Sequence, residues 1–125
     1  MPWCLGLSSN EVEIKHTSQV IYARLADSSK AYLKYSVESG VMLLVETYVP
    51  PQHRGKGLAR RLVEYAVKLA KENNWLIKPV CSYAIYYFMK NPEERAILVR
   101  EYRDLNDDEW TRLYNEARAR EQAKS

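Results

Sequence analysis

Apolar and polar side chains alternate over several short segments in the first half of the chain. Residues 19–26 (QVIYARLA) and 31–37 (AYLKYSV) alternate in this way and are rich in β-branched and aromatic residues, which predicts two strands. The segment 11–16 (EVEIKH) predicts another strand before them. Since short turns connect these segments, neighbouring strands are expected to run antiparallel.

A change of period follows in the middle of the chain. Residues 41–49 (VMLLVETYV) are largely apolar on both faces, which is typical of a central strand covered on each side. From Gly57 to about residue 74 the apolar positions recur at helical spacing. Residues 75–80 (WLIKPV) then predict a further strand. A helical crossover between two strands places them parallel, with a right-handed connection.

The last third of the chain is predicted to be helical. Residues 82–90 fit one helix, and Asn91 is expected to cap a second helix that starts at the following proline and acidic residues. A third helix is predicted over 106–125, with Asn106 and Glu109 as a capping box. Its apolar stripe consists of Trp110, Leu113, Tyr114 and Ala117.

These elements predict an α/β (α+β) fold. It would consist of a mixed twisted sheet, with antiparallel N-terminal strands and a parallel βαβ unit, and helices on the faces. With 125 residues the chain is expected to form one domain, 1–125, because domains of this size have a single core. That core would span about 11–100, with a C-terminal helical extension over about 101–125. The extension is expected to cover the chain's own core, or a second subunit, so that the protein is a monomer or a homodimer.

Charge and composition limit the partners. The 19 basic residues are balanced by 16 acidic ones, so no nucleic-acid partner is expected. No apolar run approaches the roughly 18 residues that a membrane span needs, and the first residues lack the features of a signal peptide, so we expect a cytoplasmic protein without a membrane partner. Cys4 and Cys81 are interpreted as two thiols in such a compartment.

The turn before the central helix carries the clearest chemical signal. In PPQHRGKG (50–57), Gly55 and Gly57 let the backbone approach a ligand, while Arg54 and Lys56 add positive charge. A strand, a turn and a helix N-terminus together form a phosphate site, because backbone N–H groups and the helix dipole meet there. The Walker and dinucleotide-binding glycine patterns are absent from the sequence.

The same turn satisfies Q/R-x-x-G-x-G/A, with Gln52, Gly55 and Gly57 at the fixed positions. This pattern resembles the pyrophosphate signature of the GNAT superfamily of acyl-CoA-dependent N-acetyltransferases. Residues 47–74 and 79–93 (PVCSYAIYYFMKNPE) together resemble a minimal, single-domain family of such proteins. The resemblance implies a GNAT-like fold and acetyl-CoA as the acyl donor.

The resemblance also implies which residues bind CoA. Backbone amides of the turn would hold the pyrophosphate, and the pantetheine arm would lie along the end of the preceding strand. The residues implied in CoA binding are Tyr48, Val49, Gln52, His53, Arg54, Gly55, Lys56, Gly57, Leu58 and Ala59. No metal site is expected.

Three residues are candidates for catalysis. In the minimal family the cysteine matching Cys81 is the suspected catalytic group, either as a nucleophile or as a proton donor to the CoA sulfur; the sequence leaves both roles open. Glu46 is expected on one strand face with Met42, Leu44 and Tyr48. It could act as a base, directly or through water, or it could only form a structural ion pair or a solvated strand end. The family often has a histidine at the position before the threonine, and this chain lacks it. Tyr83 could donate to the CoA sulfur or only pack in the core.

Three functions are compatible with these features. The first is an N-acetyltransferase that uses acetyl-CoA on an amine, either a small molecule or a peptide. The second is a CoA- or acyl-CoA-binding protein with weak or no catalysis, which the missing histidine favours. The third is a basic module that binds nucleic acid or protein and is built around HRGKGLARR (53–61).

Overall fold

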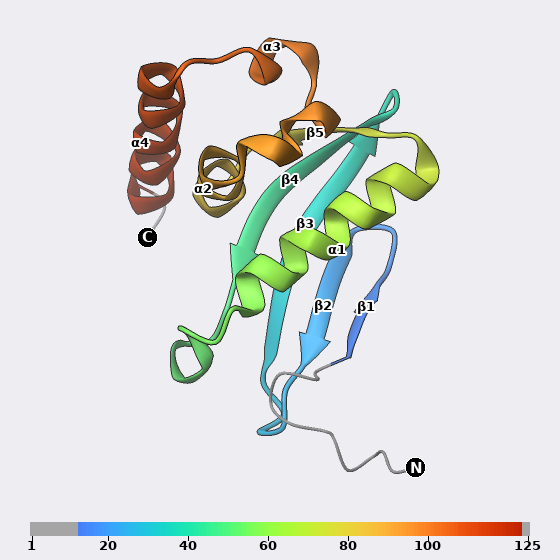
Figure 1. Cartoon of the computed structure of the whole chain (residues 1–125). Helices are drawn as coiled ribbons and strands as arrows, with labels where there is room; N and C mark the ends of the chain where they lie inside the picture. Colours follow the sequence, from blue (N-terminus) through green and yellow to red (C-terminus); the bar gives the residue numbers. More distant parts are fainter. Residues whose placement is uncertain (1–12, 124–125) are drawn as a thin grey trace.

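The computed structural model describes residues 13–123, which form a five-stranded sheet with helices (Figure 1). The strands follow one another across the sheet in chain order. They are β1 (Ile14–His16), β2 (Val20–Arg24), β3 (Lys30–Glu38), β4 (Val41–Tyr48) and β5 (Leu76–Pro79). The first four are antiparallel neighbours, and β4 pairs in parallel with β5. The predicted mixed sheet with a parallel βαβ unit is confirmed.

The helices follow the predicted periods. The crossover helix is α1 (Leu58–Asn73), and α2 (Ser82–Lys90) follows β5. Two 3-10 helices, η3 (Pro51–His53) and η4 (Pro92–Ile97), and the short α3 (Arg100–Arg103) connect the larger elements, and α4 (Asp107–Ala123) ends the described chain. At the start of α4, the capping box between Asn106 and Glu109 is confirmed by two reciprocal hydrogen bonds of 2.9 and 2.8 Å.

The predicted helix start at Asn91 is wrong in detail. The segment that follows it is the 3-10 helix η4, and the Asn91 side chain makes no capping hydrogen bond. Its amide nitrogen instead donates to the carbonyl of Tyr87 at 2.8 Å, at the end of α2. The side chain therefore satisfies a carbonyl that the end of α2 leaves without a helical partner.

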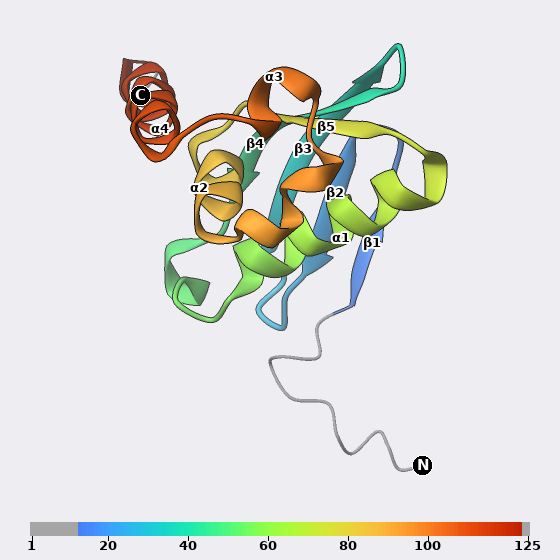
Figure 2. The ribbon, with the colours of Figure 1, turned by 45° about the horizontal axis from the view of Figure 1, so that its top comes forward.

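Among the described elements, helices α1 and α2 lie on the same face of the sheet (Figures 1 and 2). On β2, and on β3 as far as Tyr35, every second side chain is buried on that face, whereas the alternate ones are partly or fully exposed. The expectation that 41–49 is covered on both sides is therefore wrong for the described residues, since Val45 is 44% exposed. The second face of β4 is apolar, but no helix among the described residues covers it.

The pairing of β3 with β4 contains one β-bulge. Lys34 pairs with Glu46 and Tyr35 pairs with Leu44, so Val45 has no opposite residue. An extra residue of this kind reverses the side-chain alternation beyond it. Glu46 consequently lies on the face of Lys34 rather than on the buried face with Leu44. The strand face that the alternation predicted for Glu46 is wrong for this reason.

Helix α4 is anchored beside α2. Trp110 is 1% exposed and belongs to the same apolar core as the sheet and α1. The side chain of Arg95 lies 4.9 Å from its ring centroid, and the ring of Tyr102 meets it edge-on. The C-terminal extension therefore covers the chain's own core, as the first of the two alternatives expected.

Candidate functional site

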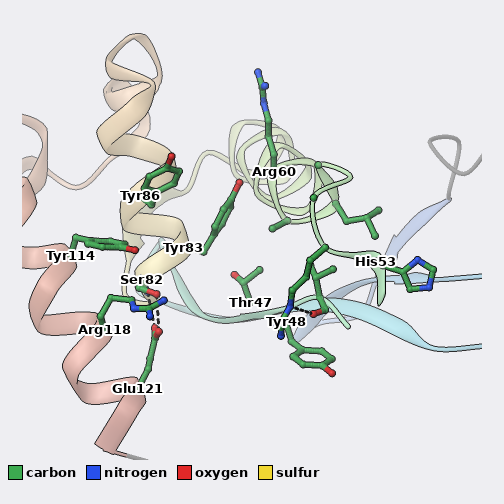
Figure 3. A pocket seen from close by; sticks show the side chains of 16 residues that line it. Thr47, Tyr48, His53, Arg60, Ser82, Tyr83, Tyr86, Tyr114, Arg118 and Glu121 are labelled. Carbon is green, nitrogen blue, oxygen red and sulfur yellow. Dashed lines mark hydrogen bonds between the residues drawn. The ribbon is translucent and has the colours of Figure 1, made fainter. Parts of the chain in front are cut away.

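A cleft of about 530 Å³ opens between the end of β4, the start of α1, and helices α2 and α4 (Figure 3). It forms where β4 and β5 diverge: the backbone N–H groups of Val80 and Cys81 both donate to the carbonyl of Leu44 at 3.0 Å, and the parallel pairing stops there. The carboxyl ends of neighbouring parallel strands are where open α/β sheets usually bind ligands. The lining residues are Thr47, Tyr48, Val49, His53, Arg54, Gly55, Gly57, Leu58, Ala59, Arg60, Ser82, Tyr83, Tyr86, Tyr114, Arg118 and Glu121.

One wall of the cleft is the turn that leads into α1. Gly57 is the N-cap of the helix, with φ 78°, a left-handed conformation that favours glycine. No side chain caps this end of α1, and its first turn holds no acidic residue. The amides at the start of α1 and the positive end of its dipole therefore face the cleft without a side-chain anion, which suits a bound phosphate.

A carboxylate from the β2–β3 connection anchors this turn. One oxygen of Asp27 lies 3.1 Å from Nε2 of Gln52, which donates to it, and 3.0 Å from Nε2 of His53. Hydrogen bonds from Ser29, Gln52 and His53 hold the pKa of Asp27 well below its usual range. Gln52 thus stabilises the turn through its contact with Asp27, and it does not line the cleft. Asp27 was not predicted from the sequence, because its contact depends on a loop far away along the chain.

Arginine side chains give the cleft its charge. The Arg54 side chain is held in place, because its Nε donates to the carbonyl of Val49 at 2.9 Å. Arg60 lies in the first turn of α1, and its Nε is 3.1 Å from a carboxylate oxygen of Glu64. Arg118 belongs to α4 on the opposite wall. Three guanidinium groups around one cleft favour a ligand with several phosphates.

Cys81 lies behind the cleft, between β5 and α2. Its side chain is 5% exposed, and Sγ is 3.3 Å from the hydroxyl of Thr47, which does line the cleft. Burial raises the pKa of the Cys81 thiol; the carboxylate of Glu121 acts in the same direction, whereas the hydrogen bond with Thr47 opposes it. The sulfur is thus a neutral thiol at ordinary pH, next to the cleft wall.

Aromatic side chains from α2 and α4 line the side of the cleft opposite the turn. The ring centroid of Tyr86 lies 6.0 Å from that of Tyr83 and 6.1 Å from that of Tyr114. Tyr83 is half-buried, and burial raises the pKa of its hydroxyl. Figure 3 shows the Tyr83 side chain between the start of α1 and Tyr86. Its hydroxyl stays protonated and able to donate a hydrogen bond.

Glu46 does not line this cleft. The bulge directs it to the helix-free face of the sheet, where its carboxylate lies 3.7 Å from the ammonium of Lys34 and accepts a hydrogen bond from the hydroxyl of Tyr32 at 3.3 Å. Half of the side chain is exposed, at 51%. The same bulge places Thr47 opposite the buried Leu33, on the face that carries the cleft.

The structure brings together nine of the predicted site residues on the cleft surface: Tyr48, Val49, His53, Arg54, Gly55, Gly57, Leu58, Ala59 and Tyr83. Lys56 points elsewhere, with Nζ 3.4 Å from Nδ1 of His53. Six further residues line the cleft that were not predicted from the sequence: Thr47, Arg60, Ser82, Tyr114, Arg118 and Glu121. Three of these belong to α4, and only the helical spacing of Tyr114, Arg118 and Glu121 could have indicated that they share a face.

Residues 20–97 of this chain, more than half of its length, match a protein-family model described as GCN5-related N-acetyl-transferase. The chain belongs to the GCN5-related N-acetyltransferase family. Members of this acyltransferase family use acetyl-CoA as the donor, and the cleft just described lies within and beside the matched segment.

A solved structure agrees with this fold. The chain is similar to a GCN5-like candidate N-acetyltransferase from Staphylococcus aureus, whose solution structure was determined by NMR. The TM-score is 0.59 and the sequence identity 24%, with 74% of this chain and 91% of that chain covered. At this identity the likeness concerns the fold. Helix α4 lies outside the segment that the family model matches.

Within residues 13–123 of this GCN5-related acetyltransferase, no cluster of three or more His, Cys, Asp or Glu side chains is arranged to bind a metal ion. None of the helices in that range combines the length and the apolar character that crossing a membrane requires.

Proposed function

We propose that this chain transfers the acetyl group of acetyl-CoA directly to an amine held in the same complex. The observation that carries the proposal is the uncapped start of α1, which faces a cleft lined by Arg54 and by two glycines with positive φ. Phosphates bind at such a helix start, because free N–H groups and the helix dipole both favour an anion. The pyrophosphate of CoA fits this position, and its pantetheine arm would extend along Tyr48 and Val49 toward the point where β4 and β5 diverge.

Cys81 acts in this proposal as a proton donor. The amine nitrogen attacks the carbonyl carbon of the thioester, an amide bond forms and the carbon–sulfur bond of acetyl-CoA breaks. The leaving CoA thiolate takes the proton of the Cys81 thiol. The attacking amine releases a proton to solvent, and solvent returns a proton to Cys81. Support comes from the burial of Cys81 and from the raised pKa of its thiol, which disfavour a resting thiolate nucleophile. Tyr83 is the second candidate donor.

The candidate base that would deprotonate the amine is Glu46. Glu46 lies outside the cleft and is paired with Lys34. It could serve only an amine that reaches the thioester from the helix-free face of the sheet. This position favours a second candidate function, a protein that binds CoA or acyl-CoA with weak or no catalysis.

Turnover separates the two candidates. The full chain is incubated with acetyl-CoA and a panel of small amines and peptides, free CoA thiol is followed with time, and each amine is weighed by mass spectrometry. The proposal expects an amine-dependent release of CoA together with an acetylated amine, both absent without the protein. CoA binding without any acetylated amine would favour the second candidate, and absence of CoA binding would contradict both. A Glu46→Gln variant with unchanged rates at every pH would remove Glu46 as the base.

A further inference from the structure

Helix α4 forms a wall of the cleft although it lies outside the segment 20–97 that the family model matches. It contributes Tyr114, Arg118 and Glu121, three residues spaced so that they share one helix face. This wall therefore offers contacts to the ligand that the matched segment does not supply. The inference drawn from it rests on the proposed binding of CoA in this cleft.

The α4 wall is held in place by contacts outside the cleft and at its base. Trp110 is buried in the core, and Nη2 of Arg120 donates to the carbonyl of Val80 at 3.2 Å. Both oxygens of the Glu121 carboxylate accept hydrogen bonds from Ser82, from the backbone N–H at 2.8 Å and from the hydroxyl at 2.7 Å (Figure 3). Such a preformed wall costs a ligand little ordering on binding.

The three arginines of the cleft differ in their partners. Arg54 donates to the carbonyl of Val49, and Arg60 pairs with Glu64. Arg118, in contrast, has no hydrogen bond or ion pair with any residue in the described part of the chain, 13–123, and its side chain lines the cleft. A guanidinium with all its donors free to bind is suited to a phosphate, which accepts two parallel N–H bonds from it.

Two aromatic rings line the cleft beside this guanidinium. Tyr114 lies one helical turn before Arg118 on α4, and its ring centroid is 6.1 Å from that of Tyr86 on α2 (Figure 3). Tyrosine faces stack on purine bases, and such contacts tolerate a partly exposed geometry. Tyr86 is 41% exposed, so its ring is accessible. A guanidinium that can bind a phosphate, together with tyrosine rings that can stack on a base, suits a nucleotide better than a simple amine.

We propose that Arg118, Tyr86 and Tyr114 form a subsite for the adenosine 3′-phosphate portion of CoA. The pyrophosphate would bind at the start of α1, and the 3′-phosphate, on the ribose of the same nucleotide, would bind Arg118 on the opposite wall. Helix α4 thereby closes the cleft around the nucleotide end of the donor. Glu121 does not compete for Arg118 as a lone carboxylate, because Ser82 already donates to both of its oxygens.

The test compares CoA with 3′-dephospho-CoA by isothermal titration of the full chain. The unaltered protein is expected to bind CoA more tightly, by about tenfold or more, because one charge-assisted contact is lost with the phosphate. Arg118→Ala should lower the affinity for CoA by a similar factor and change the affinity for 3′-dephospho-CoA by less than about twofold, so that the preference for CoA disappears. Arg112→Ala, an exposed arginine of α4 that does not line the cleft, is the matched control and should keep the preference.

Three results would overturn the subsite. Arg118→Ala could weaken both ligands equally, which indicates general damage to the cleft. It could change neither affinity, which removes Arg118 from CoA binding. It could also raise the KM for the amine alone, which assigns Arg118 to the acceptor. Failure of the unaltered protein to bind CoA at all would instead overturn the proposed function itself.

Discussion

The carboxylate of Glu121 accepts two hydrogen bonds from Ser82, the first residue of α2, and so fills the N-terminal end of that helix. Cys81 is the N-cap of α2, and a helix start normally lowers the pKa of a cysteine beside it. Here the negative charge of Glu121 offsets this influence and adds to the effect of burial, which raises the pKa of the thiol. A residue of the C-terminal helix thus favours the protonated form of Cys81.

Neutralising Glu121 should make Cys81 more reactive. In Glu121→Gln the amide retains an acceptor for Ser82 but carries no charge, so the pKa of the Cys81 thiol should fall toward its ordinary value. The alkylation rate of Cys81 by iodoacetamide, followed against pH and located by peptide mass spectrometry, should then rise at lower pH than in the unaltered protein. Glu116→Gln, on an exposed position of the same helix, should leave the profile unchanged. An unshifted profile in Glu121→Gln would show that Glu121 does not control the thiol.

Substitution of Cys81 distinguishes a proton donor from a nucleophile. As a donor it should be partly replaced by the hydroxyl of Cys81→Ser, whereas Cys81→Ala should lose most of the turnover and keep its CoA affinity. Acetyl-CoA alone should leave the mass of the protein unchanged. An added mass of about 42 Da that is absent from Cys81→Ala would instead show a covalent acetyl intermediate at an activated nucleophile. Full turnover in Cys81→Ala would end its catalytic role.

Removing the charge of Asp27 should loosen the phosphate-binding turn. The folded pKa of Asp27 is depressed, mainly by hydrogen bonds from Ser29 and Gln52. Its stabilising contribution is therefore complete above the pKa of a free aspartate, about 3.9, and is lost progressively as the pH falls from there toward the depressed folded pKa. Asp27→Asn should melt at a lower temperature than the unaltered protein near neutral pH, and the difference should begin to shrink below about pH 4. CoA affinity should also decrease, since the anchor of Gln52 and His53 is weakened.

An exposed aspartate provides the control for this experiment. Asp104→Asn removes a charge far along the chain from the turn and should keep both the melting profile and the CoA affinity. A difference for Asp27→Asn that persists unchanged into acid would contradict the assigned role, because a protonated Asp27 has no charge left to lose.

The strands β2 and β3 and the helix α1 were predictable because each depends on the local pattern of apolar and polar residues. Alternation identified β2 and β3, and the helical period from Gly57 identified α1. The face of Glu46 was not predictable, because the bulge at Val45 results from pairing with β3 and has no local sequence signal. An extra residue there reverses every side chain that follows it in the strand.

The two walls of the candidate site also differ in whether local sequence pattern could predict them. The turn at 50–57 was identified from its glycines, since positive φ and close approach to an anion require that residue type. The wall formed by α4 depends on contacts between segments about forty positions apart, such as Ser82 with Glu121. Helical periodicity predicts an apolar stripe on α4, but it does not specify which neighbour the polar face will meet.

The central claim, that the cleft at the start of α1 binds CoA, can be tested with a matched pair of glycine variants. Gly57 and Gly40 both have φ 78°, and a Cβ at either position would meet no protein atom within 4 Å. Alanine should therefore strain the backbone to the same extent at both, by about 1–2 kcal/mol. Gly57 lines the cleft, whereas Gly40 lies in the β3–β4 turn at the far end of β4.

The decisive measurement is the affinity of CoA for the unaltered chain, Gly57→Ala and Gly40→Ala by isothermal titration, with melting temperatures recorded in parallel. We expect one CoA per chain, a similar loss of stability in the two variants, and a loss of affinity of about tenfold or more in Gly57→Ala alone, because the added methyl group occupies space that the pyrophosphate needs. Equal CoA affinity in Gly57→Ala and Gly40→Ala, or no binding by the unaltered chain, would show that this cleft does not bind CoA.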